Sequence, residues 1–117
     1  MNFETLKNDK FTLIELKVDK LDNTISPLLK SHLVVLNAEG VKNIIINMQD
    51  TKYCDSSGLS AILVANRLCK NSGGVFVLSN IQDSIKKLIA ISQLDSILNI
   101  TSTIKQAEEL LSVAIPE

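Results

Sequence analysis

The sequence predicts an α/β protein in which helices cover a single mixed, mostly parallel β-sheet. Along the chain, short apolar segments alternate with amphipathic segments whose apolar residues recur every three to four positions. Residues 44–46 read Ile-Ile-Ile without alternation, which is typical of a strand covered on both faces. Two β-like segments open the chain and are joined by Asn8 and Asp9, residue types that favour tight turns.

The first strands and the first helix follow from these patterns. Residues 3–7 and 11–18 are expected to form an antiparallel hairpin at one edge of the sheet, and residues 41–48 a central parallel strand. Between them lies a helix that Thr24 or Ser26 would cap. Its apolar face is expected to comprise Ile25, Leu28, Leu29, His32, Leu33 and Leu36.

The second half of the chain continues the alternation. A helix is expected over residues 57–71, and a Ser-Gly-Gly segment ends it. A short buried strand at 75–78, a helix at 83–92 and an edge strand at 97–100 follow. Thr101 or Ser102 is expected to cap a fourth helix, whose apolar face carries Ile104, Ala107, Leu111 and Ala114.

Composition limits the class of protein. A chain of 117 residues with 45% hydrophobic and 21% charged residues predicts one globular domain over residues 1–117. Twelve basic and thirteen acidic residues leave a formal net charge of −1, and aromatic residues make up 3%, so we expect no nucleic-acid partner. No apolar run is long enough for direct membrane insertion, and residues 1–10 are polar, so we expect a cytoplasmic protein.

The sequence contains no common catalytic or cofactor motif. A phosphate-binding P-loop, a dinucleotide-binding glycine pattern and Cys/His pairs at metal-ligand spacing are all absent, so we expect no cofactor and no metal. Cys54 and Cys69 are expected to be free, buried thiols. An enzyme using Ser57 as nucleophile would need a base. The one histidine, His32, is expected at the edge of the core, so we predict that the protein is not an enzyme.

The segment Asp-Ser-Ser-Gly-Leu at residues 55–59 lies between a predicted strand and a predicted helix. Aspartate and serine are good N-cap residues, so the segment is consistent with a simple cap and tight turn. It is also consistent with a phosphoacceptor serine, because free backbone N–H groups and the helix dipole can hold a phosphate at a helix N-terminus. These residues alone leave both alternatives open.

The helix that follows offers a possible partner-binding strip. At 100° per residue, Leu63 and Val64 fall outside the predicted core face and near Ser57. Single exposed apolar residues are common on protein surfaces and need no function. Alternatively, Ser57 forms a strip for a protein partner together with Ser60, Leu63, Val64 and Arg67.

The chain resembles the STAS domain family (sulfate transporter and anti-sigma factor antagonist), and the resemblance covers nearly its whole length. The matching segments are Lys-Leu-Asp at 20–22, Ile-Ile-Ile-Asn at 44–47, Asp-Ser-Ser-Gly-Leu at 55–59, Leu-Ser-Asn at 78–80 and Ser-Gln-Leu at 92–94. Residues 103–111 resemble the C-terminal helix of the family. As a stand-alone domain, the chain is most similar to bacterial anti-anti-sigma factors. Asp19 and Asn47 depart from the family pattern, but neither departure touches the phosphoacceptor.

This resemblance implies a phosphorylation-controlled antagonist in a partner-switching pathway. The partner would be an anti-sigma factor that is also a serine kinase of the histidine-kinase-like ATPase fold, and binding it would free a sigma factor. The kinase would phosphorylate Ser57, with Ser56 as second choice, and a PP2C-type phosphatase would reverse the modification. Asp22, Asp55 and Gly58 would be the neighbours of the phosphoserine.

Some stand-alone STAS proteins have other roles. The resemblance also allows an interaction subunit of a stressosome, or of a membrane lipid-transport ATPase complex. In those roles the segment at 55–59 would serve as a docking surface without phosphorylation.

Overall fold

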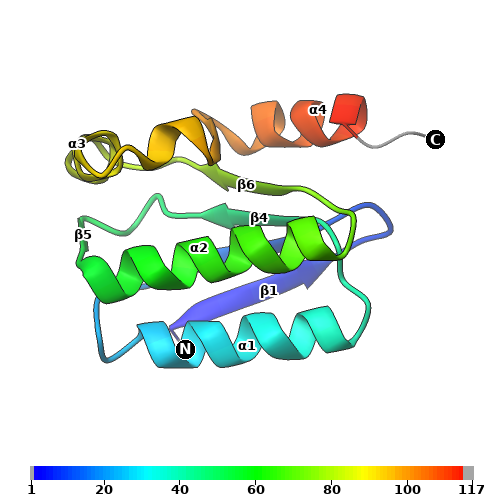
Figure 1. Ribbon diagram of the computed structural model, residues 1–117, viewed down its shortest axis with the longest axis horizontal. Helices are drawn as coiled ribbons and strands as arrows, with labels where there is room; N and C mark the ends of the chain where they lie inside the picture. Colours follow the sequence, from blue (N-terminus) through cyan, green and yellow to red (C-terminus); the bar gives the residue numbers. More distant parts are fainter. Residues whose placement is uncertain (1, 115–117) are drawn as a thin grey trace.

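The main sheet has five strands in the order β1-β2-β4-β6-β7, as seen in a computed structural model that describes residues 2–114 (Figure 1). β1 is antiparallel to β2, and the remaining neighbours are parallel. The strands are β1 (Phe3–Lys7), β2 (Thr12–Leu16), β4 (Ile44–Asn47), β6 (Phe76–Ser79) and β7 (Asn99–Thr101). This arrangement confirms the predicted α/β fold with an N-terminal hairpin.

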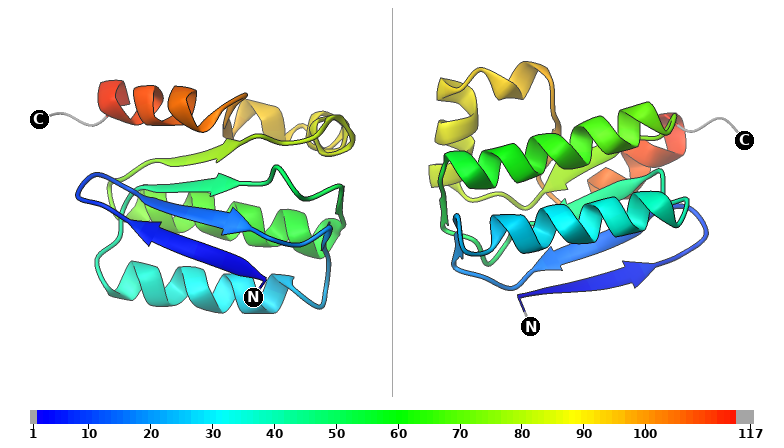
Figure 2. Two further views of the ribbon diagram at one scale, coloured as in Figure 1. Left: turned by 180° about the vertical axis from the view of Figure 1, so that it is seen from behind. Right: turned by 60° about the horizontal axis from the view of Figure 1, so that its bottom comes forward.

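Helices cover both faces of the sheet. The helices are α1 (Ser26–Ala38), α2 (Ser56–Asn71), α3 (Asp83–Ile91) and α4 (Ile104–Ala114). α1 and α2 lie side by side and parallel on one face, and α4 lies on the other (Figures 1 and 2). α3 packs on the same apolar cluster as α1 and α2, through Ile85 and Ile89. The four predicted helices are therefore present.

The central strand β4 contributes to both sides of the core. Ile44 and Ile46 belong to the large apolar cluster beneath α1 and α2. Ile45 points to the opposite face and packs in a smaller cluster with Ala107 and Leu111 of α4. Because successive side chains of a strand alternate between faces, the run of three isoleucines serves two apolar layers. The sequence-based interpretation of this run is confirmed.

A second, very small sheet was not predicted. It pairs β3 (Lys20–Leu21) with β5 (Tyr53–Cys54) in parallel. β3 leads into α1 and β5 leads into α2, so this sheet holds the N-terminal ends of the two helices at the same end of the molecule (Figure 1). Strands of two residues carry too little periodicity to be recognised in a sequence.

Two expectations about α1 are wrong. Neither Thr24 nor Ser26 caps the helix: the N-cap is Ile25, without a side-chain hydrogen bond, and Ser26 is already helical. Leu28 is 51% exposed instead of lying on the core face. The buried stripe is centred on Leu33, and Leu28 lies well to one side of it at 100° per residue.

The C-terminal elements are shifted relative to the sequence-based expectations. A 3-10 turn, η1 (Leu94–Ser96), precedes the last strand, which begins at Asn99 and not at Ile97. Thr101 belongs to that strand, and α4 begins at Ile104, so neither Thr101 nor Ser102 is the residue that caps α4. Instead, the Thr103 hydroxyl accepts a 3.1 Å hydrogen bond from the backbone N–H of Gln106, which is the usual N-cap contact.

Candidate functional site

Asp55 begins α2 as its N-cap. Its backbone is extended, with φ −101° and ψ −173°, and its carboxylate accepts a 3.0 Å hydrogen bond from the N–H of Gly58. The first backbone N–H groups of a helix have no partner within the helix, so a carboxylate at this position satisfies one of them. The positive end of the helix dipole also stabilises the negative charge of the carboxylate. This part of the sequence-based interpretation, a cap between a strand and a helix, is confirmed.

Ser57 is hydrogen-bonded to the same carboxylate. Its Oγ donates to Asp55 Oδ1 at 2.6 Å. This bond, followed by the bond from the Gly58 N–H, lowers the pKa of Asp55 below its ordinary value, so the carboxylate is charged at neutral pH. Ser57 is half-buried, whereas Ser56 is exposed. The expectation of free backbone N–H groups awaiting a phosphate at Ser57 is therefore only partly met, because Asp55 already uses the N–H of Gly58.

The loop before α1 reaches this site through Ser26. The Ser26 hydroxyl donates a 2.7 Å hydrogen bond to the backbone oxygen of Asp22, and its Oγ lies 3.4 Å from Ser57 Oγ. The Asp22 carboxylate accepts from the N–H of Thr24 at 3.0 Å, within its own turn. Asp22 thus lies near the site through its backbone, and its carboxylate stabilises the loop.

Gly58 is required by close packing. A β-carbon at this position would overlap the backbone oxygen of Leu21 and Sγ of Cys54. Any larger residue would push α2 away from the small β3–β5 sheet. The glycine therefore fixes the distance between the start of α2 and the loop that carries Asp22.

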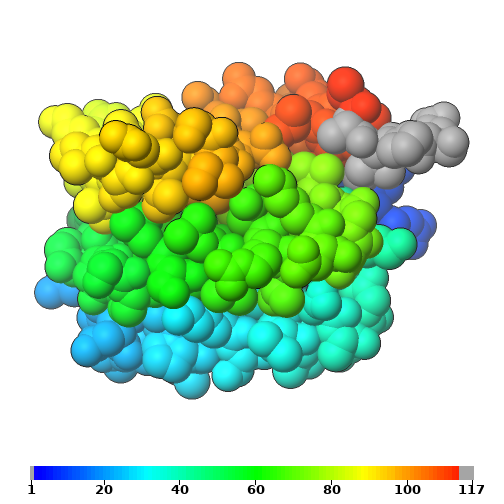
Figure 3. All heavy atoms as spheres, in the orientation of Figure 1, coloured from blue at the N-terminus to red at the C-terminus, as the bar shows by residue number. Residues whose placement is uncertain are grey.

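The predicted partner-binding strip runs along α2. Figure 3 shows α2 as a green band between α1 and α3 on one face of the molecule. Arg67 is exposed, while Ser60, Leu63 and Val64 are half-buried. Leu63 and Val64 also pack against the large apolar cluster. The expectation that these two residues point outward is thus only partly met, because each divides its surface between core and solvent.

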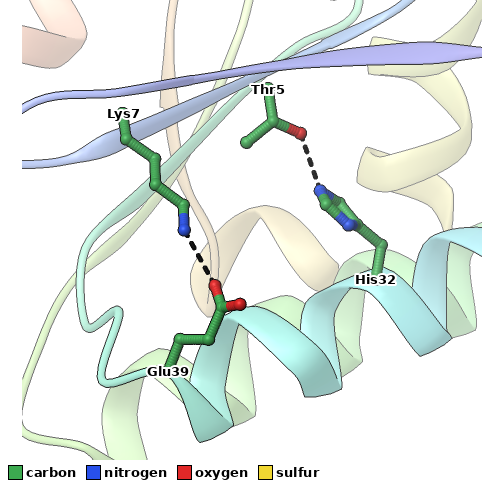
Figure 4. A network of polar contacts seen from close by, with 4 residues as sticks. All are labelled: Thr5, Lys7, His32 and Glu39. Atoms are coloured by element: carbon green, nitrogen blue, oxygen red, sulfur yellow. Dashed lines mark hydrogen bonds and ion pairs between the residues drawn. The ribbon is translucent and has the colours of Figure 1, made fainter.

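His32 is held by β1 and not by the site. Its Nε2 lies 2.7 Å from Thr5 Oγ1 (Figure 4). Its ring also packs on that of Phe3, with centroids 5.0 Å apart. Burial lowers the pKa of His32. This confirms a place at the edge of the core. The only histidine of the chain is engaged with Thr5, while Ser57 donates its proton to Asp55.

Both cysteines are free and buried, as expected. Burial raises the pKa of Cys54, and likewise that of Cys69, to about 12. Over residues 2–114, no group of three His, Cys, Asp or Glu side chains could hold a metal ion. In the same part of the chain, no helix has the length and apolar character needed to cross a membrane.

Comparison with known families gives a match to the STAS domain over residues 2–107. The chain belongs to the STAS domain family. An anti-sigma-B factor antagonist of Staphylococcus aureus is 29% identical over 102 residues, which cover 86% of this chain and 92% of that protein. The resemblance seen in the sequence is thereby confirmed.

Solved STAS structures share the fold. An anti-sigma-factor antagonist (STAS) domain protein from Planctomyces limnophilus superposes with a TM-score of 0.85 at 16% identity, covering 94% of this chain and 97% of that one. The phosphorylated form of the Bacillus cell fate determinant SpoIIAA gives a TM-score of 0.72 at 20% identity, covering 92% and 98%. At these identities the likeness concerns the fold.

Ser26 was missed as a member of the site. From the sequence alone, Ser26 is a candidate only for the cap of the first helix. Its position directly before Pro27, at the start of a helix, was the available signal, but nothing in the sequence indicated that α1 and α2 begin side by side. That proximity depends on the parallel pairing of β3 with β5.

Proposed function

We propose that this STAS protein is an anti-sigma factor antagonist whose binding is switched off by phosphorylation of Ser57. The partner is an anti-sigma factor that also acts as a serine kinase of the histidine-kinase-like ATPase fold, and a PP2C-type phosphatase restores the unmodified form. The surface that meets the partner comprises the start of α2 together with Ser60, Leu63, Val64 and Arg67. The protein acts by binding in the cytoplasm and catalyses no reaction itself.

One observation carries the proposal: the Ser57 hydroxyl is held at 2.6 Å by an ionised carboxylate in the first turn of α2. The hydroxyl is therefore kept in one orientation at the N-terminal end of α2. Membership of the STAS family supports the same assignment, as does a relative named as an anti-sigma-B factor antagonist. Ser56 is more exposed, and within residues 2–114 its hydroxyl makes no hydrogen bond comparable to that of Ser57, so we place the modification on Ser57.

Electrostatics provide the switch. A phosphate adds roughly −1.5 to −2 charges at neutral pH. It removes the proton that Ser57 donates to Asp55 and brings two negative groups together where one hydrogen bond had been. The side chain of Ser57 must then rotate, and the start of α2 becomes strongly negative. A partner that binds this surface is repelled without any change of fold.

The test is phosphosite mapping by mass spectrometry on the protein isolated from its native cells, both growing and stressed. Wild type is compared with Ser57→Ala and with Ser56→Ala as matched control. We expect phosphate that depends on growth condition, is lost in Ser57→Ala and persists in Ser56→Ala.

Two outcomes would overturn the switch. Phosphate that disappears only in Ser56→Ala would move the site by one residue. An unmodified Ser57 in every condition would remove phosphorylation from the mechanism. Co-purification with a transporter ATPase or with other STAS scaffold proteins would then support the interaction-subunit role.

A further inference from the structure

The free edge of β1 has a self-complementary pattern of backbone groups. β1 is the outermost strand of the sheet, beside β2 only (Figure 2). Its inner side is bonded through alternate residues: Asn2 accepts from Lys17, and Asn8 donates to Phe11. In an antiparallel pair this alternation continues through Glu4 and Leu6. The N–H and C=O groups of the three residues between them, Phe3, Thr5 and Lys7, therefore point away from the sheet.

We propose that a second copy of this chain pairs with that edge, β1 against β1, in an antiparallel dimer with its two-fold axis at Thr5. In this register Phe3 faces Lys7 of the second copy, and Thr5 faces Thr5. All three residues with outward-pointing backbone groups then form hydrogen-bonded pairs. The same patch is used by both copies, as a closed two-fold dimer requires. The two five-stranded sheets become one continuous sheet.

A strand of five residues is small for a stable interface, and α1 supplies additional apolar surface beside it. Leu28, His32, Val35 and Glu39 fall within a 60° arc of the helix at 100° per residue. His32 and Glu39 of this arc contact β1, through Thr5 and Lys7 (Figure 4). Leu28 and Val35, 51% and 53% exposed, therefore lie on the flank of α1 that faces the free edge.

The opposite flank of α1 is already occupied by α2. Ser26 lies beside Ser57 at the start of the two helices, and Asn37 accepts a 3.0 Å hydrogen bond from Ser72 at their C-terminal ends. Pairing through β1 would bring the two α1 helices to one face of the joined sheet, with their Leu28 and Val35 side chains turned toward the symmetry axis. The dimer would leave the start of α2 and Ser57 accessible on each copy.

Charges at the edge are compatible with this pairing. Charged side chains on an edge strand commonly prevent association with another chain. Here Lys7 is neutralised by Glu39 at 2.8 Å on the α1 side of the sheet. Glu4 points to the other face, where the proposed register places it opposite Leu6 of the second copy and next to solvent. Neither charge would be buried without a partner.

The structure supplies a matched pair of variants. Val34 and Val35 are adjacent valines in α1 with nearly equal exposure, 54% and 53%, but only Val35 lies on the flank facing β1. Sedimentation equilibrium over a range of concentrations should show a dimer for wild type. We expect Val35→Lys to raise the dimer dissociation constant at least tenfold and Val34→Lys to leave it unchanged. A wild type that stays monomeric at millimolar concentration, or two variants with the same effect, would overturn the proposal.

Amide hydrogen exchange tests the strand pairing independently of any variant. The amides of Glu4 and Leu6 bond to β2 and should be protected at all concentrations. Those of Phe3, Thr5 and Lys7 should become protected only as concentration rises through the dimer range. Outward amides that exchange at the same rate in monomer and dimer would show that β1 is not the interface. Neither measurement depends on phosphorylation, so either outcome is distinct from the fate of the Ser57 switch.

Discussion

The hydroxyl oxygens of Ser26 and Ser57 lie 3.4 Å apart, where the first turns of α1 and α2 meet. Each hydroxyl has a single proton, and each proton is used in a shorter bond: Ser26 donates to the backbone oxygen of Asp22 at 2.7 Å, and Ser57 donates to Asp55 at 2.6 Å. The contact between the serines is therefore close packing of two oxygens. A phosphoryl group on Ser57 could accept a hydrogen bond from Ser26 only if the Ser26 hydroxyl gave up its bond to the backbone oxygen of Asp22.

Ser57→Asp should weaken binding of the anti-sigma partner roughly 30- to 150-fold, which corresponds to about 2–3 kcal/mol. The added carboxylate places a second negative charge beside Asp55 and removes the hydroxyl proton that Asp55 accepts. Ser57→Ala should bind without this penalty but escape release by the kinase. Isothermal titration calorimetry with the purified partner gives the affinities, and Ser56→Asp is the control. Equal affinities for Ser57→Asp and Ser57→Ala would contradict the switch.

Gly58→Ala should destabilise the fold by about 1–3 kcal/mol, as overpacking of a close contact does. The added methyl group would overlap the backbone oxygen of Leu21, which cannot rotate away as a side chain can. Urea unfolding followed by circular dichroism measures the change in free energy of unfolding. Ser56→Ala, two residues earlier in the same helical turn and exposed, should have little effect. If Gly58→Ala had the same free energy of unfolding as wild type, β3 and α2 would be able to move apart without loss of stability.

The acid stability of the protein should depend on Asp55. Hydrogen bonds from Ser57 and Gly58 lower the pKa of this carboxyl, so its contribution to stability is fully present above the ordinary carboxyl pKa. That contribution is lost as the pH falls through the lowered value. Asp55→Asn should therefore flatten the acid side of a plot of melting temperature against pH. An unchanged acid side in Asp55→Asn would mean that the cap contributes little.

The long periodic segments could be predicted from the sequence, and the pairing of distant segments could not. The three isoleucines at 44–46 indicated a strand covered on both faces because each points into an apolar layer. The cap at Asp55 followed from local chemistry within one turn. Both inferences depend on residues that are neighbours in the sequence.

The remainder of the site depends on tertiary contacts. Ser26 lies beside Ser57 only because the two-residue strands β3 and β5 pair, and such strands carry no usable pattern. The spacing of Leu28 fits a broad apolar face and so predicts a place in the core. The sheet ends at β1, however, so that flank of α1 is only partly covered, and Leu28 stays 51% exposed. A helix at the edge of a sheet buries a narrower stripe than its sequence indicates.

His32 should titrate below its ordinary pKa of about 6.5, because burial against β1 disfavours the charged imidazole. The nearby Glu39 carboxylate raises the pKa and the Lys7 ammonium lowers it, both by smaller amounts. Glu39→Gln should thus lower the pKa further, and Lys7→Gln should raise it. Because the chain has one histidine, proton NMR follows a single titrating ring in each protein.

The same shift makes the attachment of β1 to α1 weaken in mild acid. The folded state holds His32 neutral, so its contribution to stability is complete above the unfolded pKa of about 6.5 and is lost as the pH falls toward the lowered folded value. His32→Gln should remove this part of the pH dependence while leaving the acid side that Asp55 controls. A pKa of His32 at or above the ordinary value would contradict this prediction and mean that the charge of Glu39 outweighs the effect of burial.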